Sequence, residues 1–406
     1  MATLNQRLSS LERRTTTLEM MMATLDERIA ALQGIAANHE TRITALEGTS
    51  LPPPDEYQII ATLGPGDDVM GAVTFLGPKK TILLREGTYP VSLRDAFPSG
   101  LSWAETARLQ AYPGEVPVFR PIAMEEPLRL DGPNLVRFVE FLGLRFDGSG
   151  NPDPTIGLST IRLGNCQYIR LQDYEAYGSH SGMGVSITDY CFDTEHLDGR
   201  IHDNGLLVPD PAASSIENHG FYGRGDRHLL DRMEFWNHPN GWHVHLFGGT
   251  QSDYIIRRSI FRDNGMGMFD LTGGGITLGG DRNQLYLCAF WNIAGYAIEW
   301  NGSGTLTGGH LVAHNAAYQV AAMFGSPARA INSRILNNAG QAMLAGVFQG
   351  GETTALDPSN QLVTFISPPT DFHLLAALLG VTVPEVPTDL NGVPFGSSPR
   401  IGVYAT

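Results

Sequence analysis

Three titratable residues in the second half of the chain could share one face of neighbouring strands. Four short segments align by their apolar residues: Val185-Ser186-Ile187, Val244-His245-Leu246, Phe269-Asp270-Leu271 and Ile298-Glu299-Trp300. In an extended strand the flanking residues point to one side and the middle residue to the other. Buried flanks would therefore leave His245, Asp270 and Glu299 in one outward column. A shift of one residue would exchange Asp270 with Phe269.

This column has the composition of a general acid–base site. Two carboxylates on consecutive strands have backbones about 5 Å apart, and their repulsion would raise the pKa of one and keep it protonated. Asp270 and Glu299 could then act as the two carboxylates of a glycoside hydrolase, with His245 orienting a carboxylate or binding a hydroxyl. The alternative is that outward carboxylates are only the solvated face of a strand.

Further candidates for substrate binding lie close to this column. His243 comes two residues before His245 on the same side of the strand, where the two imidazoles could bind zinc with a third ligand. A hydrogen-bonding pair of histidines is the simpler interpretation, so no metal site is predicted. Trp236 and Trp291 each precede an asparagine and could stack on sugar rings.

Arginine and aspartate recur together about once per repeat: Arg170, Arg200, Arg232 and Arg258, with Asp173, Asp198 and Asp231. Arg232 and Arg258 could bind uronate carboxylates or sulfates through paired N–H groups. The other interpretation is a ladder of ion pairs that braces the fold, which we favour. No acid-rich loop has the spacing of a calcium site, so no cofactor is predicted and calcium stays open.

The elements that must position these residues are short strands that close on asparagine. The form recurs in Leu230–Asn237, Ile256–Asn264, Tyr286–Asn292, Leu311–Asn315 and Ser333–Asn337. Several are followed by glycine and a second short strand, with one repeat per roughly 22 to 33 residues. Such a unit cannot bury its own inner face, so the pattern predicts stacked coils in a parallel β-solenoid, with the asparagines in an inward ladder.

At these residues the chain resembles right-handed parallel β-helix proteins of the pectate-lyase-like class. Thr81–Tyr89 resembles their entry coil, and Asp389–Pro394 with Arg400–Tyr404 resembles the closing segment of many bacterial members. The resemblance implies an all-β body over residues 56–406. It implies little about activity, because this fold carries lyases, hydrolases, epimerases, phage tailspikes and non-catalytic adhesins.

The first 48 residues have an unbroken heptad pattern. Leu, Met and Ile fill most seam positions from Met1 to Leu46, and the 3–4 spacing does not drift, which predicts a left-handed coiled coil. Arg42–Glu47 and Arg7–Glu12 resemble the Arg-x-x-x-apolar-Glu signature of short parallel trimers. A dimer is the alternative. We expect a homotrimeric stalk over residues 1–48 and a proline-rich linker over residues 49–55.

Composition excludes several classes of protein. The 406 residues carry a net charge of −15, which disfavours nucleic acid as a partner. No run of 18 apolar residues occurs, so no membrane insertion is expected. Three widely spaced cysteines fit neither a disulfide framework nor a zinc site. The first residues contain no apolar signal-peptide core. We therefore expect the protein to assemble in the cytoplasm and to reach a virion or the cell exterior without a signal peptide.

A coiled-coil stalk that carries a β-helix resembles phage tailspikes and tail-fibre proteins. This resemblance implies a polysaccharide or cell-surface glycan as the ligand and a virion or other particle as a partner of the coil. The first hypothesis is a glycosidase-type depolymerase that uses Asp270 and Glu299. The second is a non-catalytic fibre that binds glycan, and the third is a polysaccharide lyase with an arginine base.

Overall fold

The computed structural model describes residues 57–95, 97–153, 156–205, 218–246, 251–264, 274–300, 307–325, 330–331, 333–340, 361–362, 365–367, 371–374, 383–389, 391–395 and 403. The predicted coiled coil of residues 1–48 and the linker of residues 49–55 lie outside these ranges and stay predictions. The fold belongs to the compact unit Gln58–Thr406.

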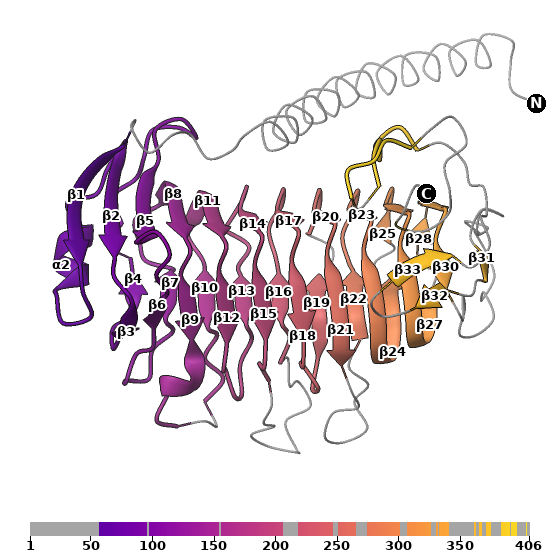
Figure 1. The fold of residues 1–406 in the computed structure, drawn as a ribbon, viewed down its shortest axis with the longest axis horizontal. Coiled ribbons are helices and arrows are strands. Elements are labelled where there is room, and N and C mark those ends of the chain that lie inside the picture. The colour runs from indigo at the N-terminus through magenta and orange to yellow at the C-terminus, as the bar shows by residue number, and fades with distance from the viewer. Residues whose placement is uncertain are drawn as a thin grey trace, which may run out of the picture. The chain divides into compact units, whose positions relative to one another are not determined.

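The first strand of each coil joins a parallel sheet, here called sheet A, which has eleven strands within the described residues (Figure 1). They are β1 (Gln58–Leu63), β2 (Lys80–Leu84), β5 (Ala107–Ala111), β8 (Val136–Leu142), β11 (Cys166–Gln172), β14 (Glu195–Leu197), β17 (Leu229–Asp231), β20 (Ile255–Arg257), β23 (Gln284–Tyr286), β26 (Leu311–Ala313) and β29 (Arg334–Leu336). Each strand pairs in parallel with the next one in this order.

The second and third strands of each coil form the other large sheet, sheet B. The second strands are β3 (Gly87–Tyr89), β6 (Pro117–Phe119), β9 (Arg145–Asp147), β12 (Glu175–Tyr177), β15 (Arg200–His202), β18 (Glu234–Trp236), β21 (Ile260–Asn264), β24 (Ala289–Trp300), β27 (Ala316–Gly325), β30 (Ala339–Gly340) and β31 (Gln361–Leu362). The third strands are β4 (Leu93–Arg94), β7 (Leu128–Leu130), β10 (Ile161–Leu163), β13 (Val185–Ile187), β16 (Phe221–Gly223), β19 (Trp242–Leu246) and β22 (Gly274–Leu278). β24 pairs with both β21 and β22 and so spans both positions.

Alternation along each strand decides which side chains enter the core. Val244 and Leu246 are buried on either side of His245, and Ile298 and Trp300 are buried on either side of Glu299. Equivalent core residues stack from coil to coil, because parallel register places them about 4.8 Å apart. The rings of Phe235, Phe261 and Phe290 stack in this way, with centroids 4.9 and 4.8 Å apart. The predicted parallel solenoid and its inward flanks are confirmed.

A short helix packs on the core beside the first coil. Helix α2 (Val69–Val73) begins after Asp68, whose carboxylate accepts a hydrogen bond of 2.8 Å from the backbone N–H of Gly71. Val69 and Val73 are buried in the same core cluster as Ile82 of β2. The helix therefore covers apolar surface of the first coil, as terminal units of repeat proteins must.

Asparagine ladders occur at inward turns, but not at every predicted asparagine. Asn315 is buried, donates to the carbonyl oxygen of Leu285 at 3.0 Å and accepts from the backbone N–H of Cys288 at 2.9 Å. Its amide therefore links neighbouring coils. Asn292 is instead exposed and donates to Asp263 at 2.7 Å. The prediction is confirmed for Asn315 and wrong for Asn292, because Asn292 lies one residue before the buried position that Asn264 and Ile293 share in register.

Candidate functional site

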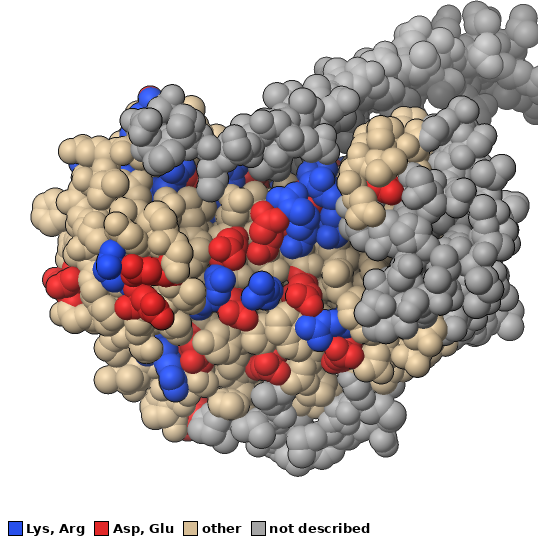
Figure 2. All heavy atoms as spheres, in the orientation of Figure 1, with Lys and Arg blue, Asp and Glu red and all other residues tan. Residues whose placement is uncertain are grey.

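Two rows of side chains run along the outward face of the second strands. The first, the charged row, consists of Arg145, Glu175, Arg200 and Glu234, which pair in register on β9, β12, β15 and β18. Opposite charges alternate along it, and Figure 2 shows acidic and basic side chains side by side on this face of the molecule. The alternation offsets repulsion between residues that parallel register forces close together.

The second row lies two residues further along the same strands. This aromatic row consists of Tyr177, His202, Trp236, Arg262, Trp291 and Tyr318, again in register. The ring of His202 is parallel to Tyr177 at 5.2 Å and to Trp236 at 3.9 Å between centroids. The guanidinium carbon of Arg262 lies 4.5 Å from the Trp236 ring centroid. The planar side chains of neighbouring coils in this row therefore stack face to face.

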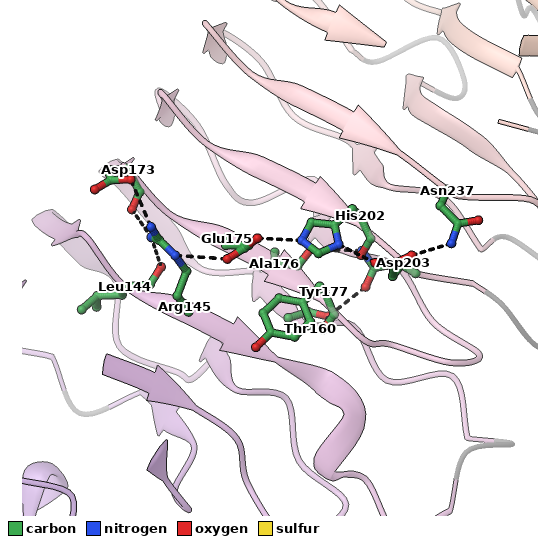
Figure 3. A network of polar contacts seen from close by, with 11 residues as sticks. Leu144, Arg145, Thr160, Asp173, Glu175, Ala176, Tyr177, His202, Asp203 and Asn237 are labelled. Atoms are coloured by element: carbon green, nitrogen blue, oxygen red, sulfur yellow. Dashed lines mark hydrogen bonds and ion pairs between the residues drawn. The ribbon is translucent and has the colours of Figure 1, made fainter. Parts of the chain in front are cut away.

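The two rows meet in a hydrogen-bonded cluster around His202 (Figure 3). The Nε2 atom of His202 lies 2.8 Å from Glu175, and the Nδ1 atom lies 2.7 Å from Asp203. Glu175 also forms an ion pair of 3.1 Å with Arg145, and Asp203 accepts a hydrogen bond from the side-chain amide of Asn237. The hydrogen bond from His202 lowers the pKa of Glu175, against the effect of its partial burial, and Arg145 adds to the lowering.

These contacts fix the orientation of the His202 ring. Both ring nitrogens face a carboxylate, Nε2 that of Glu175 and Nδ1 that of Asp203. Stacking on Tyr177 and Trp236 fixes the plane of the ring as well. Because both ring nitrogens of His202 already have a carboxylate partner, the cluster is suited to binding a ligand through polar groups of fixed orientation.

Arg200 is the exposed cation of this surface. It lies on β15, two residues before His202 and on the same face, with Glu175 and Glu234 in register on the neighbouring coils. Alternate residues of a strand lie roughly 6.6 Å apart along it. The exposed guanidinium of Arg200 thus lies beside the His202 cluster, at a distance along the strand comparable to the length of one sugar residue.

The predicted column of His245, Asp270 and Glu299 has a different composition in the structure. Register pairs His245 with Thr277 of β22, and Thr277 with Glu299 of β24. Asp270 lies outside the described residues. His245 and Glu299 each lie between two buried apolar neighbours on their strands, although His245 is itself buried. The alignment of Asp270 between them was wrong, because that position belongs to Thr277. The partner of Glu299 on the other side is Gly325, so the described column holds no adjacent pair of carboxylates.

His245 and His243 have separate partners. The Nδ1 of His245 lies 2.5 Å from Nε2 of His219, whose own Nδ1 accepts from the backbone N–H of Trp242 at 2.9 Å. His219 therefore donates to His245, which leaves the proton of neutral His245 on Nε2. Burial lowers the pKa of His245 to about 4. His243 is fully buried, contacts His238 at 2.8 Å, and has a pKa lowered by burial to about 3.

His243 was wrongly placed beside His245 on the outward face, since it packs against the core ring of Phe235. No group of three residues able to ligate a metal occurs within the ranges that the structure describes. Nor does any helix in those ranges have the length and apolar character needed to span a membrane.

The two predicted tryptophans are confirmed at equivalent positions of the aromatic row. Their expected use as flat platforms for sugar rings needs correction for Trp236. His202 and Arg262 lie on the coils on either side of it, so both faces of its ring are covered. Only the ring edge and the indole N–H are left for a ligand. Trp291 lies between Arg262 and Tyr318 in register.

The predicted arginine column splits into three places. Arg170 is on the outward face of sheet A between Glu140 and Glu195, at 2.7 Å from each, and Arg200 belongs to the charged row. Arg232 and Arg258 occupy a corner after sheet A, with φ of 55° and 51°. The single column was wrong because these corner residues follow the strand instead of belonging to it.

At the corner, both arginines form ion pairs. Arg232 binds Asp198 at 2.5 and 3.0 Å, and Arg258 binds the fully buried Asp231 at 2.7 Å. Arg257 and Arg232 also reach Asp231, at 3.1 and 2.8 Å. The ladder interpretation is therefore the better description of Arg232 and Arg258.

Sequence reasoning missed Glu175, His202, Asp203 and Arg262. A usable signal was present, since Arg200-Ile201-His202-Asp203-Asn204 has the same form as Ile260–Asn264. Extending the asparagine-ended alignment two coils toward the N-terminus would have placed His202 level with Arg262, although it would have set Trp236 one residue out of register, level with Asp203. The bond from His202 to Glu175 could not be read this way, because it depends on side-chain rotamers.

Comparison with solved structures places the fold. Pectate lyase Pel9A aligns with a TM-score of 0.61 and 14% identity over 88% of this chain and 97% of that chain. An alginate lyase from Paenibacillus sp. str. FPU-7 aligns with a TM-score of 0.50 and 13% identity over 68% of this chain and 99% of that chain. The Dettilon tailspike protein aligns with a TM-score of 0.34 and 11% identity over 74% of this chain and 67% of that chain.

No protein-family model matches the sequence, and no curated protein matches it. At 13–14% identity, the two lyases show the fold alone. With its stacked parallel strands and this similarity, the described part of the chain has a parallel β-helix fold similar to that of pectate lyase Pel9A.

Proposed function

We propose that this protein is a glycan-binding β-helix protein that holds an extended polysaccharide along the aromatic and charged rows of sheet B. The observation that carries the proposal is the register of six outward planar groups, from Tyr177 to Tyr318. Five coil steps of about 4.8 Å give a surface about 24 Å long, which accommodates several sugar residues of one chain.

The ligand chemistry follows from what the rows expose. Because the faces of Trp236 are covered, sugars would meet ring edges, the indole N–H, carboxylates and the guanidinium of Arg200. These groups suit the hydroxyls of a polysaccharide, which can both donate and accept. Since the chain carries a net charge of −15, long-range attraction would not favour a polyanion. Binding should therefore depend weakly on salt.

The test of binding is affinity electrophoresis in gels that contain single neutral or acidic polysaccharides. Arg200→Ala should weaken binding about tenfold, because a hydrogen bond to a charged group contributes about 1.5 kcal/mol. Arg137→Ala is the matched control, since Arg137 is an exposed arginine on β8 of sheet A. Equal loss in both variants, or retardation that Arg200→Ala leaves unchanged, would place the binding surface elsewhere.

A second candidate function is cleavage of the bound glycan, and the pair Tyr222–His245 favours it. The Tyr222 hydroxyl accepts from Arg224 at 3.0 and 3.3 Å, and His245 lies in register on the next coil with its tautomer fixed by His219. A phenol beside a guanidinium and a neutral imidazole are a usable acid and base. The pair would suit eliminative cleavage, and two proteins of similar fold are named as lyases.

The glycosidase hypothesis with Asp270, Glu299 and His245 remains the competing proposal. Digestion of a polysaccharide panel separates the two, because a lyase creates ultraviolet absorbance and a hydrolase creates only reducing ends. Tyr222→Phe should abolish eliminative cleavage, while Glu299→Gln should not. Loss of activity in Asp270→Asn and Glu299→Gln, with Tyr222→Phe active, would favour the hydrolase. If no polysaccharide is shortened, both cleavage proposals fail and the non-catalytic glycan-binding protein remains.

The quaternary arrangement is also a proposal. We infer from the heptads of residues 1–48 a parallel homotrimer whose coil attaches the glycan-binding body to a virion or another particle. Light scattering of the full chain should give three times the chain mass of 44.1 kDa. A monomer would remove this part of the proposal without affecting the binding surface.

A further inference from the structure

Cys166 and Cys191 lie beside each other in the core. Their Sγ atoms are 3.1 Å apart and both side chains are fully buried. Cys166 opens β11, and Cys191 directly precedes Phe192, which pairs in parallel with Gln167. The backbone N–H of Phe192 donates to the carbonyl oxygen of Cys166 at 3.2 Å. The two cysteines therefore occupy equivalent positions on consecutive coils.

This geometry is close to that of a disulfide. Equivalent residues of parallel neighbours lie about 4.8 Å apart, inside the range of roughly 4.4–6.8 Å that disulfides span between Cα atoms. The sulfurs would have to approach by about 1 Å to reach the bond length of about 2.05 Å. A rotation of the side chains can supply such a movement without separating the coils.

We propose that Cys166 and Cys191 form a disulfide that cross-links two consecutive coils under oxidising conditions. With glutathione disulfide as the oxidant, one thiolate attacks it and releases glutathione, and the second thiol then displaces the other glutathione. Two thiols lose two protons and two electrons, and one glutathione disulfide becomes two glutathione molecules. Cys288, the third cysteine, contacts the carbonyl oxygens of Tyr286 and Ile256 at 3.5 and 3.9 Å instead.

The setting predicts a slow reaction and a stabilising product. Burial raises the pKa of Cys191 well above the ordinary value, and Cys166 adds to this, so the reactive thiolate is scarce in the closed fold. Oxidation then requires local opening of the coil. Once formed, the bond restricts the unfolded chain over a separation of 25 residues. That loop includes Glu175 and Tyr177, although the inference does not depend on glycan binding.

The experiment counts thiols in the full chain. Purified protein is incubated with glutathione disulfide or with reduced glutathione, then denatured, alkylated with iodoacetamide and digested for mass spectrometry. In the oxidised sample we expect one alkylated cysteine, Cys288, and one linked pair of peptides that carry Cys166 and Cys191. The reduced sample should give three alkylated cysteines. Three alkylated cysteines after oxidation, or glutathione adducts on unlinked cysteines, would overturn the proposal.

Two variants supply matched controls. Cys288→Ser should keep the linked peptides and lose the remaining alkylated cysteine. Cys191→Ser should lose the linked peptides. If Cys191→Ser does not fold, Cys166→Ala serves as the control variant in its place. Oxidation should raise the urea midpoint of the wild type and of Cys288→Ser, and leave that of Cys191→Ser unchanged. A link that involves Cys288, or a midpoint that rises equally in Cys191→Ser, would contradict the assignment.

Discussion

His202 lies parallel to Trp236 on the next coil, with ring centroids 3.9 Å apart and an angle of 5° between the planes. The separation is less than the coil spacing of about 4.8 Å, so the two rings lean together. Tyr177 on one side and Arg262 on the other continue the stack. This contact stiffens the outward face of sheet B and turns ring edges, not faces, toward any ligand.

The first prediction concerns Trp236. Replacing it with alanine removes stacking on both His202 and Arg262, so Trp236→Ala should lower the free energy of unfolding by about 2 kcal/mol. Trp236→Phe keeps a ring between the same neighbours and should lose less than half of that. Urea unfolding followed by circular dichroism measures both. Equal losses in the two variants would mean that an aromatic ring between these neighbours does not by itself stabilise the fold.

The second prediction concerns the buried carboxylate of the corner ladder. Burial alone would raise the pKa of Asp231, but hydrogen bonds and charges from Arg258, Arg257 and Arg232 outweigh it and hold the pKa below the ordinary value. Asp231→Asn removes the negative charge and leaves these arginines facing one another. Breaking a buried ion pair typically costs about 3–5 kcal/mol, so the variant should unfold at much lower urea concentration.

Asp198→Asn is the control for this prediction. Asp198 binds Arg232 and accepts a long hydrogen bond of 3.4 Å from Gln172, and its side chain is 36% exposed, so its loss should cost at most about 1 kcal/mol. If both variants lost the same small amount, Asp231 would be contributing no more than a surface ion pair.

The repeat and the alternation of strands could be predicted from sequence because both are local. Val244 and Leu246 flank His245 in the pattern and in the fold alike. The register between coils could not be predicted wherever a loop changes length. Nine residues, 265–273, separate β21 from β22, and an alignment by apolar residues selected Asp270 where the sheet pairs Thr277. The same pattern also cannot distinguish a strand residue from a corner residue such as Arg232.

The third prediction tests the inward asparagine ladder. Asn315→Ala would leave the backbone N–H of Cys288 and the carbonyl oxygen of Leu285 buried without the partners they now have. Each unsatisfied buried group costs roughly 1–3 kcal/mol, so a loss of about 3 kcal/mol is expected. Asn292→Ala removes one exposed hydrogen bond to Asp263 and should cost below about 1 kcal/mol. A reversed order of the two losses would refute the ladder.

The fourth prediction is that stability falls as the pH drops from about 6.5 to about 3, with His196 as one cause. His196 is inward-facing between Leu171 and Leu230, and burial lowers its pKa to about 3. Within this pH window the unfolded chain binds a proton at His196 and the folded chain does not. Each pH unit therefore costs about 1.4 kcal/mol for this residue. His243, with a pKa also lowered to about 3, adds a similar slope.

A pair of variants isolates the contribution of His196. The Tyr174 hydroxyl bonds to Nδ1 of His196 at 2.9 Å, so His196→Leu alone would leave a buried hydroxyl without that partner and lower stability at every pH. The double variant Tyr174→Phe with His196→Leu removes both polar groups. In urea unfolding at pH 8, 6 and 5, both variants should lose stability with acid less steeply than the wild type, by about 1.4 kcal/mol per unit below pH 6.5. Only the single variant should be weaker at pH 8, because only it keeps an unsatisfied hydroxyl in the core. An acid slope unchanged from the wild type in the double variant would assign the proton uptake to other histidines.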